Sequence, residues 1–255
     1  MFIGDEYSNI HGSTVRVVEI LKGTRTASIK NIETGEIIIR NRDNIKTGNF
    51  KTSTCRTVYG VGYLGVGNFT CRDSNGILSE EYRIWSNMLR RCYTNYKSDK
   101  NITYINVEVC DEWHNFQNFA DWYSRAVLKF KEYNIFPNID KDLFSATGRG
   151  ILYSPETCCI LPSIINASLV EKRCTNGLHH GVITRRGKFI AMVMYKYKTY
   201  RVVCTTLEQA IKSYTILKKK VLCELAEEYK HVLEHQVYDK LIKWDIHKRK
   251  EKLYD

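Results

Sequence analysis

The chain has 255 residues, of which 43% are hydrophobic and 26% are charged. This composition excludes wholesale disorder and allows one sizeable core or two to three small ones. No apolar run approaches the roughly 18 residues of a membrane span, and the first residues lack the basic and apolar stretches of a secretion signal. We therefore expect a soluble, intracellular protein with no membrane partner.

The formal net charge of +11 is concentrated in the last third of the chain. From Leu169 onward there are 19 lysines and arginines and 10 aspartates and glutamates, which leaves 19 − 10 = +9 there. A polyanion is the natural partner of this charge, whereas a lysine-rich surface that only maintains solubility is the alternative. The nine cysteines form no Cys-x-x-Cys pair and are odd in number, so we expect reduced thiols in the cytosol.

Residues 1–55 predict a small β domain. Apolar and polar side chains follow a period of two along Thr14–Ile20 and Glu36–Arg40. Turn signals lie between them at Gly23, Asn31 and Gly35. We expect a small, twisted antiparallel barrel or sheet.

Residues 56–170 begin with a glycine cluster at Tyr59–Asn68. Its spacing differs from that of a phosphate-binding loop, and no Gly-Lys-Ser/Thr follows, so we expect a tight junction between strands. Two amphipathic helices should follow, one along Tyr82–Cys92 and one from Asn115, as the N-cap, to Phe130. Their aromatic side chains could stack on bases, but the helical spacing favours a core. A short strand is expected between the helices.

The segment Asn138–Asn166 carries the candidate chemistry. It predicts a strand, a loop, a short strand and the start of a helix, an order that suits a ββα-metal hairpin. Its Asp140-Lys-Asp, its glycine loop and its Tyr153-Ser-Pro-Glu-Thr-Cys resemble the core of phage HNH endonuclease-like proteins. Upstream motifs that resemble the same phage family are Tyr82-Arg-Ile-Trp-Ser-Asn-Met-Leu-Arg-Arg-Cys-Tyr, Val109-Cys-Asp-Glu-Trp and Asn115-Phe-Gln-Asn-Phe.

The resemblance covers roughly Gly60–Leu169 and implies a divalent cation, Mg²⁺ or Mn²⁺. Asp140 and Asn166 match the metal ligands of the HNH pattern. Lys141 stands where the family has its general-base histidine, and Thr157 where it has a central asparagine. An ordinary lysine, with a pKa of about 10.4, is already protonated at neutral pH and cannot take a proton from water.

Lys141 and Asp142 are nevertheless the candidate catalytic residues. Either burial makes Lys141 a base, or the hydrolytic step is lost. His114 is a further candidate base, because it could approach from the neighbouring helix. The alternative for the whole hairpin is a structural role, in which Asp140 and Asp142 cap the loop or pair with arginines.

Residues 171–233 predict a module of one sheet and one helix. Three short strands joined by tight turns at Arg186-Gly187 and Lys196–Lys198 precede a helix whose capping box would be Thr205-x-x-Glu208. The helix carries one apolar stripe, which should cover one face of the sheet and leave the other face free. The stripe consists of Leu207, Ala210, Ile211, Tyr214, Leu217, Val221, Leu225 and Ala226.

Over Gly177–Tyr229 this module resembles the ethylene-response-factor-type (APETALA-type) DNA-binding domain, which also occurs in phage and mobile HNH nucleases. The matching motifs are Gly181-Val, Arg185-Arg, Gly187-Lys-Phe-Ile-Ala and Thr206-Leu-Glu-Gln-Ala. The resemblance implies a sheet in the major groove of double-stranded DNA, with arginines on guanine edges and lysines on phosphates. The candidate DNA-binding residues are Arg185, Arg186, Lys188, Lys196, Lys198 and Arg201. Charged strands that are merely solvated are the alternative.

Residues 234–255 predict a basic helical tail whose apolar face is too weak for a role at a membrane surface. The sequence thus predicts an α+β, multidomain protein with a β-barrel-like N-terminal domain, a ββα-metal-like central domain and a C-terminal three-stranded antiparallel sheet plus helix. We expect a phage DNA-binding protein of HNH endonuclease lineage in the cytoplasm of an infected bacterium, with metal-dependent hydrolysis of DNA phosphodiesters as its candidate activity. The alternative is a catalytically inactive, inhibitory protein that binds DNA or a host protein.

Overall fold

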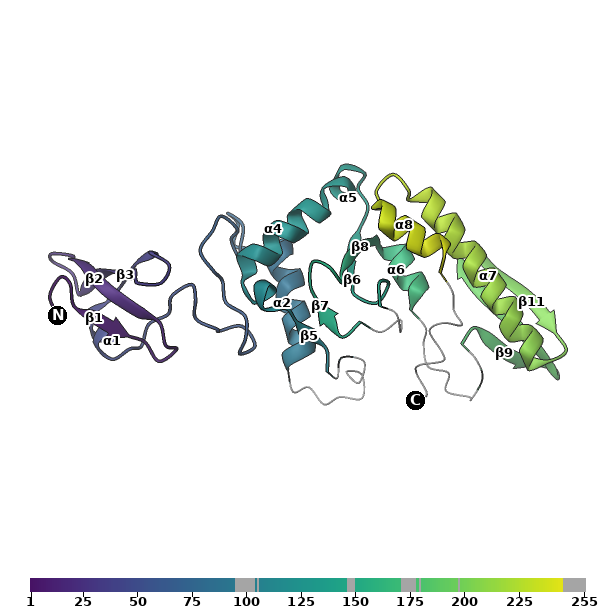
Figure 1. Ribbon diagram of the computed structural model, residues 1–255, viewed down its shortest axis with the longest axis horizontal. Helices are drawn as coiled ribbons and strands as arrows, with labels where there is room; N and C mark the ends of the chain where they lie inside the picture. Colours follow the sequence, from purple (N-terminus) through teal and green to yellow (C-terminus); the bar gives the residue numbers. More distant parts are fainter. Residues whose placement is uncertain are drawn as a thin grey trace. The chain divides into compact units, whose positions relative to one another are not determined.

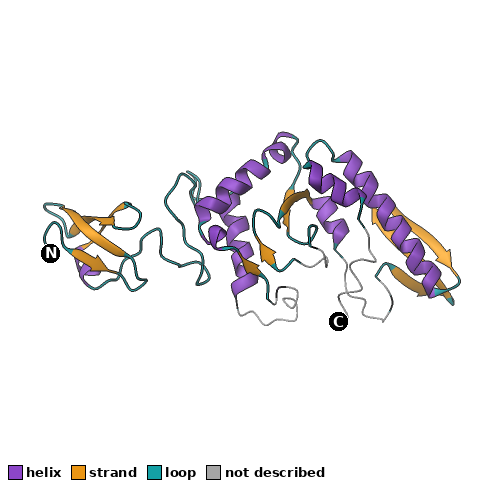
Figure 2. Cartoon of the chain, in the orientation of Figure 1, coloured by secondary structure: helices purple, strands orange, loops and turns teal. Residues whose placement is uncertain are grey.

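The computed structural model describes residues 1–94, 104, 106–145, 150–170, 178, 180–196 and 198–244. The chain divides into two compact units, the first formed by Met1–Arg125 with Ile151–Ser154 and the second by Ala126–Gly150 with Pro155–Asp255. Both units combine helices with strands, and the strands belong to several separate sheets (Figure 1, Figure 2). The predicted α+β fold class is therefore confirmed, while the domain boundaries at residues 55, 170 and 233 stay a prediction.

A four-stranded antiparallel sheet in the order β1–β2–β3–β4 opens the first unit, and a short helix, α1, follows it. Period-two alternation places Val17 and Ile29 on one face, where Ile45 and Phe50 pack against them. A bulge between Val17 and Glu19 shifts the register of β2 against β3. The elements are β1 (Glu6–Ser8), β2 (Thr14–Ile20), β3 (Thr26–Asn31), β4 (Ile37–Asn41) and α1 (Arg42–Lys46).

The glycine cluster forms the tight turn that its sequence predicts. Val58 and Gly62 form an antiparallel bridge around Tyr59 and Gly60, whose φ angles are both positive. A Cβ atom on Gly62 would lie 2.4 Å from a side-chain carbon of Leu89. Glycine is required there because the loop packs directly against the helix that contains Leu89.

The rest of the first unit is a helical layer with an aromatic core. The Ser79 hydroxyl caps the helix α2, and the Asn115 side chain accepts a hydrogen bond from the Gln117 amide at the start of α4. The rings of Trp85 and Phe116 lie 5.4 Å apart, so the aromatic residues form a core, as predicted. The elements are α2 (Glu80–Tyr93), α3 (Asp111–His114), α4 (Phe116–Ala126) and the parallel pair β5 (Glu108–Val109) and β7 (Leu152–Tyr153).

The single helix expected from Asn115 to Phe130 is interrupted. Helix α4 ends at Ala126, and a separate helix, α5 (Leu128–Glu132), follows it. Val127 interrupts the helical dihedrals with φ −94° and ψ 0°. The apolar period alone did not reveal this break. It predicts that Phe130 is buried whether the helix is continuous or divided, and Phe130 is buried in the structure.

The second unit contains the predicted strand–loop–strand–helix segment. Strands β6 (Pro137–Asp140) and β8 (Cys159–Pro162) pair antiparallel, with Asp140 opposite Cys159. Helix α6 (Ser163–Leu169) packs on both strands. Leu161 and Ile165 are fully buried and belong to the main apolar core of this unit.

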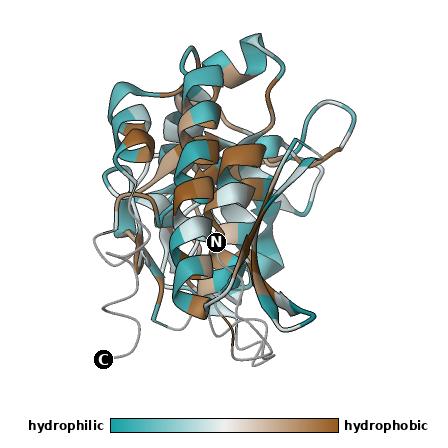
Figure 3. Ribbon diagram, turned by 90° about the vertical axis from the view of Figure 1, so that its right-hand side faces the viewer, coloured by the Kyte–Doolittle hydropathy of each residue, from teal (hydrophilic) through white to brown (hydrophobic). Residues whose placement is uncertain are grey.

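A three-stranded antiparallel sheet in the order β11–β10–β9 completes the second unit, and α7 lies along it (Figure 1). Apolar and polar residues alternate along the helical ribbons, as expected for helices that cover a core (Figure 3). Tyr214, Leu222 and Leu225 of α7 are buried in that core. The elements are β9 (Val182–Arg185), β10 (Lys188–Tyr195), β11 (Lys198–Cys204), α7 (Leu207–Glu228) and α8 (His235–Ile242).

The cap of α7 lies one residue later than predicted. The N-cap is Thr206, whose hydroxyl accepts a hydrogen bond from the Gln209 amide at 3.2 Å. The side chain of Gln209, rather than that of Glu208, reaches back and accepts hydrogen bonds from the backbone and hydroxyl of Thr205. The N-cap bond is thus present at Thr206, but the returning side chain contacts the preceding residue, so the predicted reciprocal capping box is not formed.

Helix α8 accounts for part of the predicted basic tail. Residues 245–255 of that tail and residues 171–177 of the predicted DNA-binding module lie outside the described residues. Among the residues that are described, no helix is both long and apolar enough to cross a membrane.

Candidate functional site

The sheet β9–β11 has one face covered by α7. Residues directly opposite each other in antiparallel strands point to the same side of the sheet. Val182 lies opposite Ala191, and both are buried in the core that includes α7. Cys204 and Val193, which share that side, are buried in the same core. The alternate residues of each strand therefore point away from α7.

We call this second side of the sheet the open face. Its residues form rows across the strands, as the register shows: Arg185 with Lys188, Ile183 with Ile190 and Val203, Met192 with Arg201, and Met194 with Thr199. Met194 and Val203 are 72% and 60% exposed, so large apolar side chains meet solvent there. The described strands β9, β10 and β11 contain no Asp or Glu.

The structure separates the six candidate DNA-binding residues into two groups. Arg185, Lys188 and Arg201 lie on the open face and are exposed. Arg186 lies beside them in the turn between β9 and β10, where its φ of 50° and the positive φ of Gly187 are typical of a type I′ hairpin.

Lys196 and Lys198 lie elsewhere. The Lys196 ammonium is 2.7 Å from a carboxylate oxygen of Glu228 on α7. This hydrogen-bonded partner raises the pKa of Lys196. Lys198 lies opposite Tyr195, which packs against the core on the α7 side. The two lysines therefore do not join the open face, a division that depends on strand register.

Gly181 fixes the distance between the sheet and α7. Its φ is +74°, and a Cβ atom there would lie 2.0 Å from the ring of Tyr214. The Gly181 carbonyl also accepts a hydrogen bond from the Met192 amide at 2.7 Å, which extends the pairing of β9 with β10. Only glycine satisfies both the backbone conformation and the close contact with the ring.

The loop after β6 holds the candidate catalytic and metal-binding residues. One carboxylate oxygen of Asp140 accepts hydrogen bonds from the amides of Asp142 and Leu143, at 3.0 and 2.7 Å. The carboxylate of Asp142 accepts from the Gly150 amide and from the Lys141 ammonium, both at 2.7 Å. These contacts give both carboxylates a structural role in the loop.

Lys141 is only 4% exposed and donates to Asp142 as an ammonium. The Lys141 side chain is thus engaged with a carboxylate inside the loop, and its role as a general base stays a prediction. Asn166 lies on α6, which packs against β6, and is partly exposed. Among the described residues, no three His, Cys, Asp or Glu side chains gather as a metal site.

Cys159 lies opposite Asp140 in the pairing of β6 with β8. Burial raises the pKa of its thiol well above the ordinary value, and the charge of Asp140 raises it further. A thiol that keeps its proton is a poor nucleophile and a poor metal ligand. Asp140 in this loop and Asn166 on α6 as metal ligands stay a prediction.

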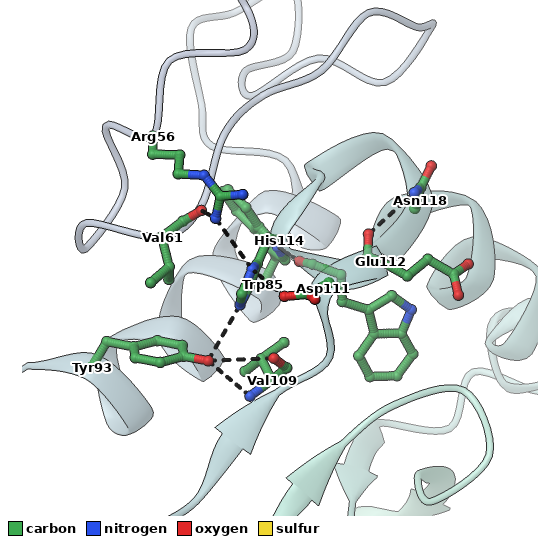
Figure 4. A network of polar contacts seen from close by, with 10 residues as sticks. Arg56, Val61, Trp85, Tyr93, Val109, Asp111, Glu112, His114 and Asn118 are labelled. Atoms are coloured by element: carbon green, nitrogen blue, oxygen red, sulfur yellow. Dashed lines mark hydrogen bonds and ion pairs between the residues drawn. The ribbon is translucent and has the colours of Figure 1, made fainter. Parts of the chain in front are cut away.

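His114, the further candidate base, lies in a polar network of the first unit (Figure 4). Arg56 approaches its Nδ1 at 3.5 Å, and the Tyr93 hydroxyl lies 3.3 Å from its Nε2. A carboxylate oxygen of Asp111 also lies 3.4 Å from Nδ1, so this nitrogen faces both a guanidinium and a carboxylate. Tyr93 in turn accepts from the Val109 amide and donates to the Val109 carbonyl.

Nε2 of His114 therefore connects α3 to Tyr93 of α2 and through it to β5, while Nδ1 contacts Arg56 of the loop before α2. Burial lowers the pKa of His114, and the Arg56 charge acts in the same direction, while Asp111 opposes both. The network has a structural role, because its hydrogen bonds hold the elements of the helical layer together. The sequence showed His114 as an isolated histidine but carried no signal for its partner Arg56, which precedes it by 58 positions.

No family model, curated protein or solved structure matches the chain. The function is therefore inferred from the chemistry of the open face and of the Asp140 loop.

Proposed function

We propose that this protein binds double-stranded DNA through the open face. The observation that carries the proposal is the exposure of Arg185, Lys188 and Arg201 on a sheet face whose strands contain no carboxylate. Three strands span about 10 Å, and the major groove of B-DNA is about 12 Å wide, so such a sheet fits the groove. We propose that this binding occurs in the cytoplasm of an infected bacterium, as the phage-type resemblances of the sequence imply.

The test compares two double variants with the same loss of charge. Arg185→Ala with Arg201→Ala removes two cations from the open face, whereas Lys196→Ala with Lys198→Ala removes two cations that lie elsewhere. The affinity for a duplex is measured over a range of salt concentrations. The first variant should bind more weakly and lose about 0.9 of log–log salt slope per phosphate contact removed. Equal effects of the two variants would reject the open face as the DNA-binding surface.

A second candidate function is metal-dependent hydrolysis of DNA at the Asp140 loop. The observation that favours it is the β6–β8–α6 arrangement, with Asp140 at the end of a strand and Asn166 on the helix. One carboxylate and one amide oxygen suit Mg²⁺ or Mn²⁺, which often completes its ligands with water and phosphate oxygens. The cation would polarise a phosphoryl oxygen and acidify a bound water.

A plasmid-nicking assay with Mg²⁺ or Mn²⁺ tests this candidate. Wild-type protein should nick the plasmid, and Asp140→Ala should not. The ion pair between Lys141 and Asp142 favours the alternative, a catalytically inactive protein that inhibits by binding DNA or a host protein. Intact plasmid with wild type in both metals, or nicking undiminished in Asp140→Ala, would reject hydrolysis at this loop and leave DNA binding to be judged by the salt experiment.

A further inference from the structure

The open face is more apolar than a surface that only contacts phosphates. Its central row consists of Ile183, Ile190 and Val203 on three neighbouring strands. Ile183 is 37% exposed and Val203 is 60% exposed, although both lie at the centre of a charged surface. A ligand that covered these side chains would gain the free energy of removing their apolar surface from water.

The basic side chains lie on both sides of this apolar row. Arg185 follows Ile183 by two positions in β9, and Arg201 precedes Val203 by two positions in β11. Two residues along a strand correspond to about 7 Å, so each arginine flanks the row at about this distance. Long, flexible cations at the two sides can reach phosphates while the short, branched side chains meet what lies between them.

From this arrangement we infer that the row Ile183, Ile190 and Val203 recognises the 5-methyl groups of pyrimidines in the major groove. The inference rests on the proposed DNA binding and names the feature of DNA that the open face selects. The thymine methyl group is the one apolar group that a base pair presents in the major groove, and apolar side chains are its usual contacts. A protein partner for this face would have to be acidic and apolar at once.

The expected selectivity follows from the size of one methyl group. Removing a methyl group from water contributes about fourfold in affinity for each group that is fully buried. Duplexes that contain thymine should therefore bind about fourfold more tightly, for each methyl group contacted, than the same duplexes with uracil. The minor-groove edge of the base pair is the same in both.

The experiment measures the affinity of the full-length chain for one mixed-sequence duplex in its thymine and uracil forms. Val203→Thr replaces a methyl group of the row by a hydroxyl, and Val202→Thr makes the same change on the α7 side of the same strand. Both positions are exposed by at least 37%, so neither change opens a core. Val203→Thr should reduce the preference for thymine, and Val202→Thr should retain it.

Three results would overturn the inference. Equal, salt-dependent binding of both duplexes by wild type would reject methyl recognition and leave the proposed DNA binding intact. An undiminished preference for thymine in Val203→Thr would assign it to another surface. Failure to bind either duplex at low salt would reject the proposed function, and methyl recognition with it.

Discussion

Gly181→Ala should destabilise the second unit strongly, and two contributions to the loss can be separated. A left-handed backbone costs a residue with a Cβ atom about 1–2 kcal/mol. The new methyl group would also lie 2.0 Å from the Tyr214 ring, which is 2% exposed and has no room to move aside. Overpacking of this kind costs about 1–3 kcal/mol. We therefore expect a total loss of about 2–5 kcal/mol in the free energy of unfolding.

Gly187→Ala is the matched control. Gly187 has a φ of +73°, almost identical to that of Gly181, but no atom lies within 4 Å of its would-be Cβ. This variant should lose only the backbone contribution, about 1–2 kcal/mol. Hydrogen exchange of the α7 amides, measured at increasing urea concentrations, reports the free energy of unfolding of this unit specifically. Equal losses in the two variants would refute the contact between Gly181 and Tyr214 as a constraint on the fold.

Three further predictions concern single side chains. Thr206→Ala should destabilise α7 by about 1 kcal/mol because it removes the N-cap acceptor, while Thr206→Ser should not; thermal unfolding distinguishes them. Burial lowers the pKa of His114 from its ordinary value of 6.5, so the unfolded chain binds a proton first on acidification. The stability that neutral His114 contributes should be complete above pH 6.5 and decline as the pH falls from there through the folded-state pKa; His114→Gln should show a flatter dependence in urea titrations between pH 7.5 and 5.5. Lys196→Ala should leave the melting temperature unchanged, because the exposed ion pair with Glu228 is screened; a clear drop would show that the pair is structural.

The local elements were largely predictable, because each depends on neighbours in the sequence. The apolar spacing of Trp85, Met88 and Leu89 predicted α2, and all three side chains are buried. The turn at Arg186-Gly187 followed from Gly187, which adopts positive φ without strain, although Arg186 takes a positive φ as well. The one-residue error at the cap of α7 has the same origin, since Thr205 and Thr206 are both suitable caps and only the hydrogen bonds distinguish them.

The sequence predicted which residues belong to each candidate site, but not how those residues contact one another. The sequence indicated Asp140, Lys141 and Asp142 as a chemical group. In the structure, the Lys141 ammonium pairs with Asp142, whereas Asp140 accepts from the backbone amides of the loop. The sequence could not show that Gly150, eight positions after Asp142, would complete that loop. Contacts of this kind depend on loop closure, which composition and periodicity do not encode.

The basic charge, the strand–turn pattern and the capped helix of residues 171–233 were all determined by the sequence alone. They depend on side-chain type and on spacings of a few residues, which act before the chain has folded. Only the tertiary structure decided which cations share a surface: Arg185 and Arg201 both lie on the open face, while Lys196 pairs with Glu228, 32 positions away. The physical reason is that strand register and helix packing set the direction of each side chain, and both form only when distant segments come together.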